Sequence, residues 1–158
     1  MSLSVHAQDK VVAGYFADWQ YNNPDNPYQV KDIPAENLTH IIYAFLSMCG
    51  PHTGASEVIQ KKQVAEHCKD KAPFTAIVVD QQAALQEDFG PVSVDVDYKG
   101  HFAQLAQLKK NISRYRHTAF FLVVGLCRNH FMQWPKTLKP LNTFSKTAVE
   151  LIANYDFF

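Results

Sequence analysis

A chain of 158 residues is long enough to bury a single hydrophobic core, and a composition that is 47% hydrophobic and 13% aromatic argues against intrinsic disorder. Fifteen basic and fifteen acidic residues cancel, and no basic run occurs, so the charge gives no support for binding to nucleic acid or to an anionic membrane surface. No apolar run approaches the ~20 residues of a membrane helix. We therefore expect a neutral partner.

The first ten residues are predicted to be a flexible N-terminus. Met1–Lys10 is too short and too polar to be a complete signal peptide. Val5, His6 and Ala7, followed by Gln8, nevertheless resemble the small-residue end of a cleavage site. These residues are either the remnant of an export signal or a plain disordered terminus, and the sequence leaves both open.

Four apolar runs predict the strands of one sheet. The central run lies within Asn37–Ser47, where Ile41–Leu46 is unbroken and rich in β-favouring residues. Such a run predicts a strand buried on both faces, as in a parallel sheet covered by helices. We expect four parallel strands, within Val11–Phe16, Asn37–Ser47, Phe74–Val79 and Thr118–Val124.

Helical patterns alternate with these runs. Glu57–Lys69 and His101–Lys110 are predicted to be helices, Gln81–Gln86 a short helical segment, and Ile33–Asn37 a helical turn. The alternation of strand and helix predicts the α/β class, as a βα barrel or a doubly wound sheet.

Aromatic residues gather in Ala17–Lys31, which is predicted to be a loop at the carboxyl end of the first strand because it is rich in Asn, Pro and Asp. Trp19, Tyr21 and Tyr28 lie on it. Such rings suit a sugar-binding groove, since a pyranose stacks its C–H face on an aromatic plane. An equally weighted alternative is that they fold back into a small core.

The odd number of cysteines, Cys49, Cys68 and Cys127, permits at most one disulfide. A bond between Cys49 and Cys68 would contribute about 3 kcal/mol by the chain-entropy estimate, and the alternative is unpaired thiols. His52 and His67 suggest zinc only weakly, because adjacent His67 and Cys68 are poorly placed to face one ion and the spacing matches no recognised pattern. We expect no metal and no cofactor.

Four strings of this sequence, taken in order, resemble the start of family-18 glycoside hydrolases, most closely those of the bacterial chitinase A type. They span most of Val11–Lys110: GYFADW (Gly14–Trp19), IPAENLTHIIYAF (Ile33–Phe45), AALQ (Ala83–Gln86) and YKGHFAQL (Tyr98–Leu105).

The resemblance implies that residues 11–158 are the N-terminal part of a catalytic domain, an incomplete TIM (β/α)8 barrel of its first three to four βα units. It also implies hydrolysis of β-1,4-linked N-acetylglucosamine polymers by a substrate-assisted, retaining mechanism, and a secreted or periplasmic location. The implied partners are chitin or N-acetylglucosamine oligosaccharides.

The resemblance also assigns roles to individual residues. The family's aromatic residues that match Tyr15 and Trp19 line its sugar cleft, and Phe45, at the end of the second string, is a third candidate for substrate binding. Cysteines placed like Cys49 and Cys68 are bridged in the family.

The resemblance is lost over Ile112–Pro140 and returns in Leu141–Phe158. The Ser-x-Gly-Gly-Trp motif expected at the end of the family's third strand is absent. From Val123 onward, permissible codons read in a shifted frame give Gly-Gly-Trp and its continuation, so we interpret this segment as frameshifted. Cys127 belongs to the shifted frame and is expected to be a free thiol.

The family's catalytic signature, Asp-x-x-Asp-x-Asp-x-Glu, does not occur and would follow Phe158. Its glutamate protonates the leaving oxygen while the substrate's acetamido oxygen attacks.

Asp95 and Asp97 are predicted to be a solvated pair on a loop before a helix, so no residue is assigned a catalytic role. We expect the chain alone to be inactive. The alternatives are a non-catalytic chitin-binding module, in which Tyr15 and Trp19 stack on the sugar, or a purely structural domain with core aromatics.

Overall fold

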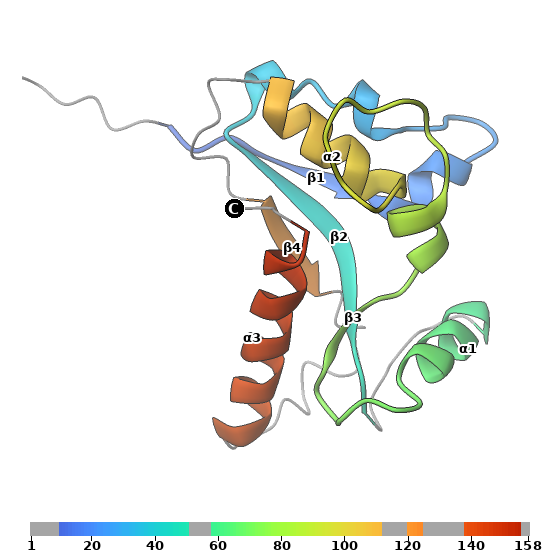
Figure 1. Cartoon of the computed structure of the whole chain (residues 1–158), viewed down its shortest axis with the longest axis vertical. Coiled ribbons are helices and arrows are strands. Elements are labelled where there is room, and N and C mark those ends of the chain that lie inside the picture. Colours follow the sequence, from blue (N-terminus) through green and yellow to red (C-terminus); the bar gives the residue numbers. More distant parts are fainter. Residues whose placement is uncertain (1–9, 51–57, 112–119, 125–137, 156–158) are drawn as a thin grey trace, which may run out of the picture.

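The structure is a computed structural model that describes residues 10–50, 58–111, 120–124 and 138–155 (Figure 1). Its strands are β1 (Ala13–Ala17), β2 (His40–Met48), β3 (Ala76–Val78) and β4 (Phe120–Val124). Its helices are α1 (Val58–His67), α2 (Gly100–Asn111) and α3 (Leu138–Ala153). Short helical turns are η1 (Asp18–Asn22), η2 (Val30–Asp32), η3 (Ala35–Asn37) and η4 (Gln82–Gln86).

The sheet is organised around β2, the longest strand. Ala44 pairs in parallel register with Ala17 of β1 and with Val123 of β4, so β1 and β4 lie on opposite sides of β2. β3 pairs with Leu46–Met48, where β2 extends beyond β1. The described part of the chain therefore forms a small mixed sheet with helices.

The prediction of four parallel strands is wrong for the third apolar run, because β3 is antiparallel to β2. The chain re-enters the sheet at the carboxyl end of β2. Cys68 is bonded to Cys49, and the backbones of Phe74 and Thr75 are hydrogen-bonded to that of Cys49, the residue after β2. From there Ala76–Val78 runs back along β2 with Ala76 opposite Met48, as the second strand of a hairpin does.

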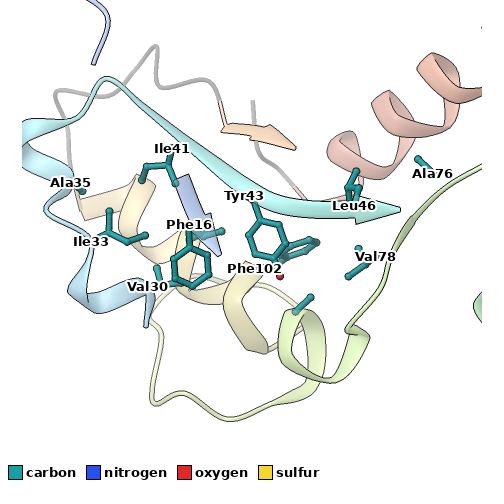
Figure 2. Close-up of a cluster of buried hydrophobic side chains, with 12 residues drawn as sticks. Phe16, Val30, Ile33, Ala35, Ile41, Tyr43, Leu46, Ala76, Val78 and Phe102 are labelled. Atoms are coloured by element: carbon teal, nitrogen blue, oxygen red, sulfur yellow. The ribbon is translucent and has the colours of Figure 1, made fainter. Parts of the chain in front are cut away.

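The main core covers one face of the sheet. Phe16 and Tyr43 are neighbours in the β1–β2 register and meet Phe102 of α2, whose ring centroid lies 5.2 Å from that of Tyr43 (Figure 2). Partly buried residues of α3 pack against the same cluster: Phe144, Ala148 and Leu151. The alternation of buried and less buried positions along β1 is the period expected of a strand with one covered face.

The prediction that Ile41–Leu46 is buried on both faces is correct only in part. Ile41, Tyr43 and Leu46 are buried, but Ile42 is half-buried and Phe45 is exposed. The predicted helices around α1 and α2, the helical segment at η4 and the turn at η3 are all confirmed. None of the helices in the described ranges is long and apolar enough to cross a membrane.

Candidate functional site

Trp19 and Phe45 form an exposed aromatic pair at the carboxyl end of β1, beside the parallel strand β2, and we call this pair the aromatic platform. Their rings are stacked, with centroids 5.4 Å apart and planes inclined by 22°. Trp19 is 51% exposed and Phe45 36% exposed. Ala17 pairs with Ala44, so Trp19 lies two residues and Phe45 one residue beyond a paired position on adjacent strands.

A bulge in β2 exposes the Phe45 ring. Ala44 pairs with Val123 and Leu46 pairs with Val124, so Phe45 is an extra residue that has no counterpart in β4. A β-bulge bends the strand and redirects a side chain. Ala44 and Leu46 therefore stay buried on either side of Phe45, while Phe45 projects to the surface beside Trp19.

Tyr15, the remaining candidate for substrate binding, is 69% exposed and lies on β1. It precedes buried Phe16, so its side chain projects from the face of the sheet opposite to the one on which Phe16 packs. The structure thus brings Trp19 and Phe45 together, while Tyr15 lies four residues before Trp19 on the same strand and turn.

The other aromatic residues of the first loop are partly buried and pack against neighbouring rings. The Tyr21 ring lies against those of Phe89 and His101, at centroid distances of 5.2 Å and 5.4 Å. Tyr28 packs against Phe16 and donates a hydrogen bond of 2.9 Å to the carbonyl of Asp32. Both interpretations of the loop aromatics therefore apply, each to different residues: Tyr21 and Tyr28 fold back, and Trp19 faces solvent.

Asp18, which the sequence interpretation did not single out, is a buried carboxyl next to the platform. It is 6% exposed and begins η1, directly before Trp19. Burial, and to a lesser extent the nearby Asp80 carboxylate, raise the pKa of Asp18 to about 7, while hydrogen bonds from Trp19 and Tyr43 oppose the shift. Nothing local in the sequence marks this aspartate as buried, because its burial depends on contacts with β2 and η4.

His101 is a second buried ionisable group in the same core. Its ring stacks on Phe89 at 4.5 Å, and its Nδ1 lies 3.4 Å from the hydroxyl oxygen of Tyr43. Its Nε2 has no hydrogen-bond partner among the described residues. Because burial disfavours the charged imidazolium, the pKa of His101 is lowered to about 4, and the ring is neutral at neutral pH.

Cys49 and Cys68 are joined by a disulfide in the structure. They pack with Val64 and Ile77 in a second, smaller core beside β3. The described residues contain no group of three or more side chains able to hold a metal ion, and His52 and Cys127 lie outside the described ranges.

Asp95 and Asp97 are exposed on the loop that precedes α2, as predicted. Most of Ile112–Pro140, the segment interpreted as frameshifted, lies outside the described residues, apart from β4 and the first residues of α3.

No family model matches the chain. Curated chitinases, in contrast, match part of its sequence. A chitinase of Autographa californica nuclear polyhedrosis virus is 32% identical over 108 residues, which are 65% of this chain and 19% of that protein. Chitinase A of Pseudoalteromonas piscicida is 29% identical over 104 residues, 64% of this chain and 12% of that protein. The chain is homologous to chitinases.

Solved structures agree. Chitinase ChiA74 of Bacillus thuringiensis superposes with a TM-score of 0.70 at 25% identity, covering 95% of this chain and 26% of that one. A family GH18 chitinase from Chromobacterium violaceum gives a TM-score of 0.60 at 23% identity, covering 93% of this chain and 22% of that one. The resemblance to family-18 chitinases is therefore confirmed, and the chain spans less than a fifth of the length of the viral and Pseudoalteromonas chitinases.

Proposed function

We propose that residues 11–158 are the N-terminal part of a family-18 chitinase catalytic domain, an incomplete (β/α)8 barrel, and that the aromatic platform with Tyr15 binds chitin or N-acetylglucosamine oligosaccharides. The observation that carries the proposal is the exposed, stacked pair of Trp19 and Phe45 at the carboxyl end of β1, where it lies parallel to β2. In βα barrels, residues at this end of the strands build the active site.

The chemistry of the platform fits a neutral sugar. Two large rings remain open to solvent at the same place, although burying them would otherwise be favourable. Stacking against the C–H face of a pyranose would recover that burial without needing a charge. The equal numbers of acidic and basic residues are consistent with such a ligand.

We further propose that the chain by itself binds the polymer without hydrolysing it. The 158 residues contain no Asp-x-x-Asp-x-Asp-x-Glu motif, and the exposed Asp95 and Asp97 lie before a helix instead of at a strand end. General acid catalysis typically contributes ~10²–10⁴-fold, and the positioned acetamido assistance would be missing as well. Turnover of a fluorogenic N-acetylglucosamine oligomer by the repurified chain would contradict this.

The alternative, a non-catalytic chitin-binding module, rests on the same platform. The enzyme part and the binding module differ in the activity expected once the reading frame is restored. Restoring the reading frame across Ile112–Pro140 and continuing past Phe158 into the catalytic signature should give a working hydrolase if this is part of an enzyme. An inactive repaired protein would favour the module.

A secreted or periplasmic location is part of the proposal. The Cys49–Cys68 disulfide supports it, because disulfides persist mainly in oxidising compartments.

Retention on chitin beads tests the binding function. The intact chain should be retained at neutral pH, and Trp19→Ala should abolish retention because it removes half of the platform. The matched control is Val149→Ala, which truncates an exposed apolar side chain on α3 and should leave retention unchanged. Full retention of Trp19→Ala would refute the platform.

A further inference from the structure

We propose that the buried carboxyl of Asp18 is the positioning residue of the aromatic platform: it holds η1, and with it Trp19, against β2 and η4. Asp18 is the link between the strand and the platform, because Ala17 before it ends β1 and Trp19 after it stacks on Phe45. The inference rests on the proposed sugar-binding role of that platform.

The contacts of Asp18 reach several elements at once. Its carboxyl group accepts hydrogen bonds from the Trp19 backbone and from the Tyr43 hydroxyl of β2. Tyr43 is itself buried, and its hydroxyl lies 3.4 Å from His101 on α2. One buried carboxyl thus ties the turn that bears Trp19 to the centre of the sheet and, through Tyr43, to α2.

Asp80 makes this attachment sensitive to ionisation. Its Oδ1 accepts a hydrogen bond of 2.9 Å from the backbone N–H of Ala83, so the carboxylate is fixed at the start of η4, which contacts η1. Asp80 acts electrostatically on Asp18, on Tyr43 and on Tyr21. A proton on Asp18 removes the repulsion between the two carboxylates, and its loss restores it.

The remaining titratable groups around this attachment do not compensate the charge. They are the phenols of Tyr43 and Tyr21, the imidazole of His101, which burial keeps neutral, and Glu87, which acts on Tyr21. An ionised Asp18 therefore faces a like charge in a buried setting, and outward movement of η1 would relieve it. That movement separates Trp19 from Phe45.

The pH of the change follows from the ionisation of Asp18, whose pKa of about 7 places proton loss near neutrality. Below this pH the protonated carboxyl keeps the platform assembled. Above it, the sugar affinity should fall by about fivefold, the lower end of typical coupling between linked equilibria.

Fluorescence of Trp19 tests positioning without any sugar. The chain has two tryptophans, and Trp134 lies outside the described residues, so Trp134→Phe leaves Trp19 as the sole indole. In that background we expect an emission transition with a midpoint near pH 7, absent in Asp18→Asn. Asp80→Asn keeps the oxygen that accepts from Ala83 but removes the charge, so it should move the midpoint to lower pH. Asp97→Asn, an exposed aspartate, is the control that should change nothing.

The outcomes separate this inference from the proposed function. A transition that survives in Asp18→Asn, or an unshifted midpoint in Asp80→Asn, overturns the positioning role even if Trp19 is needed for chitin retention. Retention that does not depend on Trp19 refutes the sugar site, while the fluorescence transition still decides the role of Asp18. If Asp18→Asn fails to fold, judged by far-UV circular dichroism, the Asp80→Asn shift decides.

The last experiment tests whether sugar affinity depends on pH. Calorimetry measures the affinity for an N-acetylglucosamine hexamer at pH 6 and at pH 8. We expect about a fivefold weakening in the unmodified chain and equal affinities in Asp18→Asn. An unmodified chain that binds equally well at both pH values contradicts the inference.

Discussion

Two aromatic clusters in this chain arise from the same short stretches of sequence and have opposite environments. Phe16 and Tyr43 lie in the core with Phe102, whereas Trp19 and Phe45, only two or three residues further along, face solvent. The core cluster is closed by α2, and the platform is left open by a turn after β1 and a bulge in β2. Aromatic character alone therefore does not distinguish a packing residue from a binding residue, and variants of the two clusters test that division.

Removing a core ring should have the largest effect. Phe102→Ala deletes a fully buried side chain and leaves a cavity against Tyr43 and Tyr155, so we expect the free energy of unfolding to fall by about 3–5 kcal/mol. Trp19→Ala should change it by less than ~1 kcal/mol, because the ring is half exposed. Urea denaturation of both variants measures the contrast, and similar losses would erase the distinction between the clusters.

Asp18, next to the platform, and His101, in the core, should change the free energy of unfolding with pH in opposite directions. The pKa of Asp18 is raised from 3.8 to about 7, so the folded state holds a proton that the unfolded chain has lost, and stability falls as pH rises through this interval. The pKa of His101 is lowered from 6.5 to about 4, so stability falls as pH drops from 6.5 to 4. The two slopes oppose each other, and the unmodified chain should show a shallow profile between pH 4 and pH 7.

Single variants should reveal each slope. Asp18→Asn leaves the His101 contribution, so stability should rise by up to about 3 kcal/mol from pH 4 to pH 6.5. His101→Phe keeps an aromatic ring and leaves the Asp18 contribution, so stability should fall by up to about 4 kcal/mol from pH 4 to pH 7. Denaturation series across pH measure both. Slopes of the same sign in the two variants would show that the assigned groups are wrong.

The disulfide should stabilise the small core beside β3 without shaping the platform. Cys49 and Cys68 are separated by 19 positions in the chain, so replacing both by serine should cost about 3 kcal/mol of unfolding free energy. Chitin retention of the folded double variant should stay at the level of the unmodified chain. Peptide mapping without reductant checks the pairing, and a Cys68–Cys127 linkage as the main species would contradict it.

Many strands, helices and turns of this molecule could be predicted from the sequence, because the patterns that indicate them are local. The apolar run within Asn37–Ser47, the periodicity of His101–Lys110 and the turn at Ile33–Asn37 each appear within a few residues, and each formed the expected element. The strings resembling chitinases identified the relatives and, with them, Trp19 and Phe45 as candidates. The helix α3 was missed as an element, although Phe144, Ala148 and Leu151 repeat at helical spacing within it.

Three features were decided only by tertiary structure. β3 runs antiparallel because the chain re-enters the sheet beside Cys49, at the carboxyl end of β2, and runs back along that strand. Phe45 is exposed because the register with β4 shifts at that residue, and Asp18 is buried because β2 and η4 close around it. The sequence by itself determined the strands, the helices other than α3, and which rings were candidates, since periodicity and composition act over a few neighbours. Strand direction, the bulge and the burial of a carboxyl depend on partners that lie tens of residues away in the chain, and no local pattern records them.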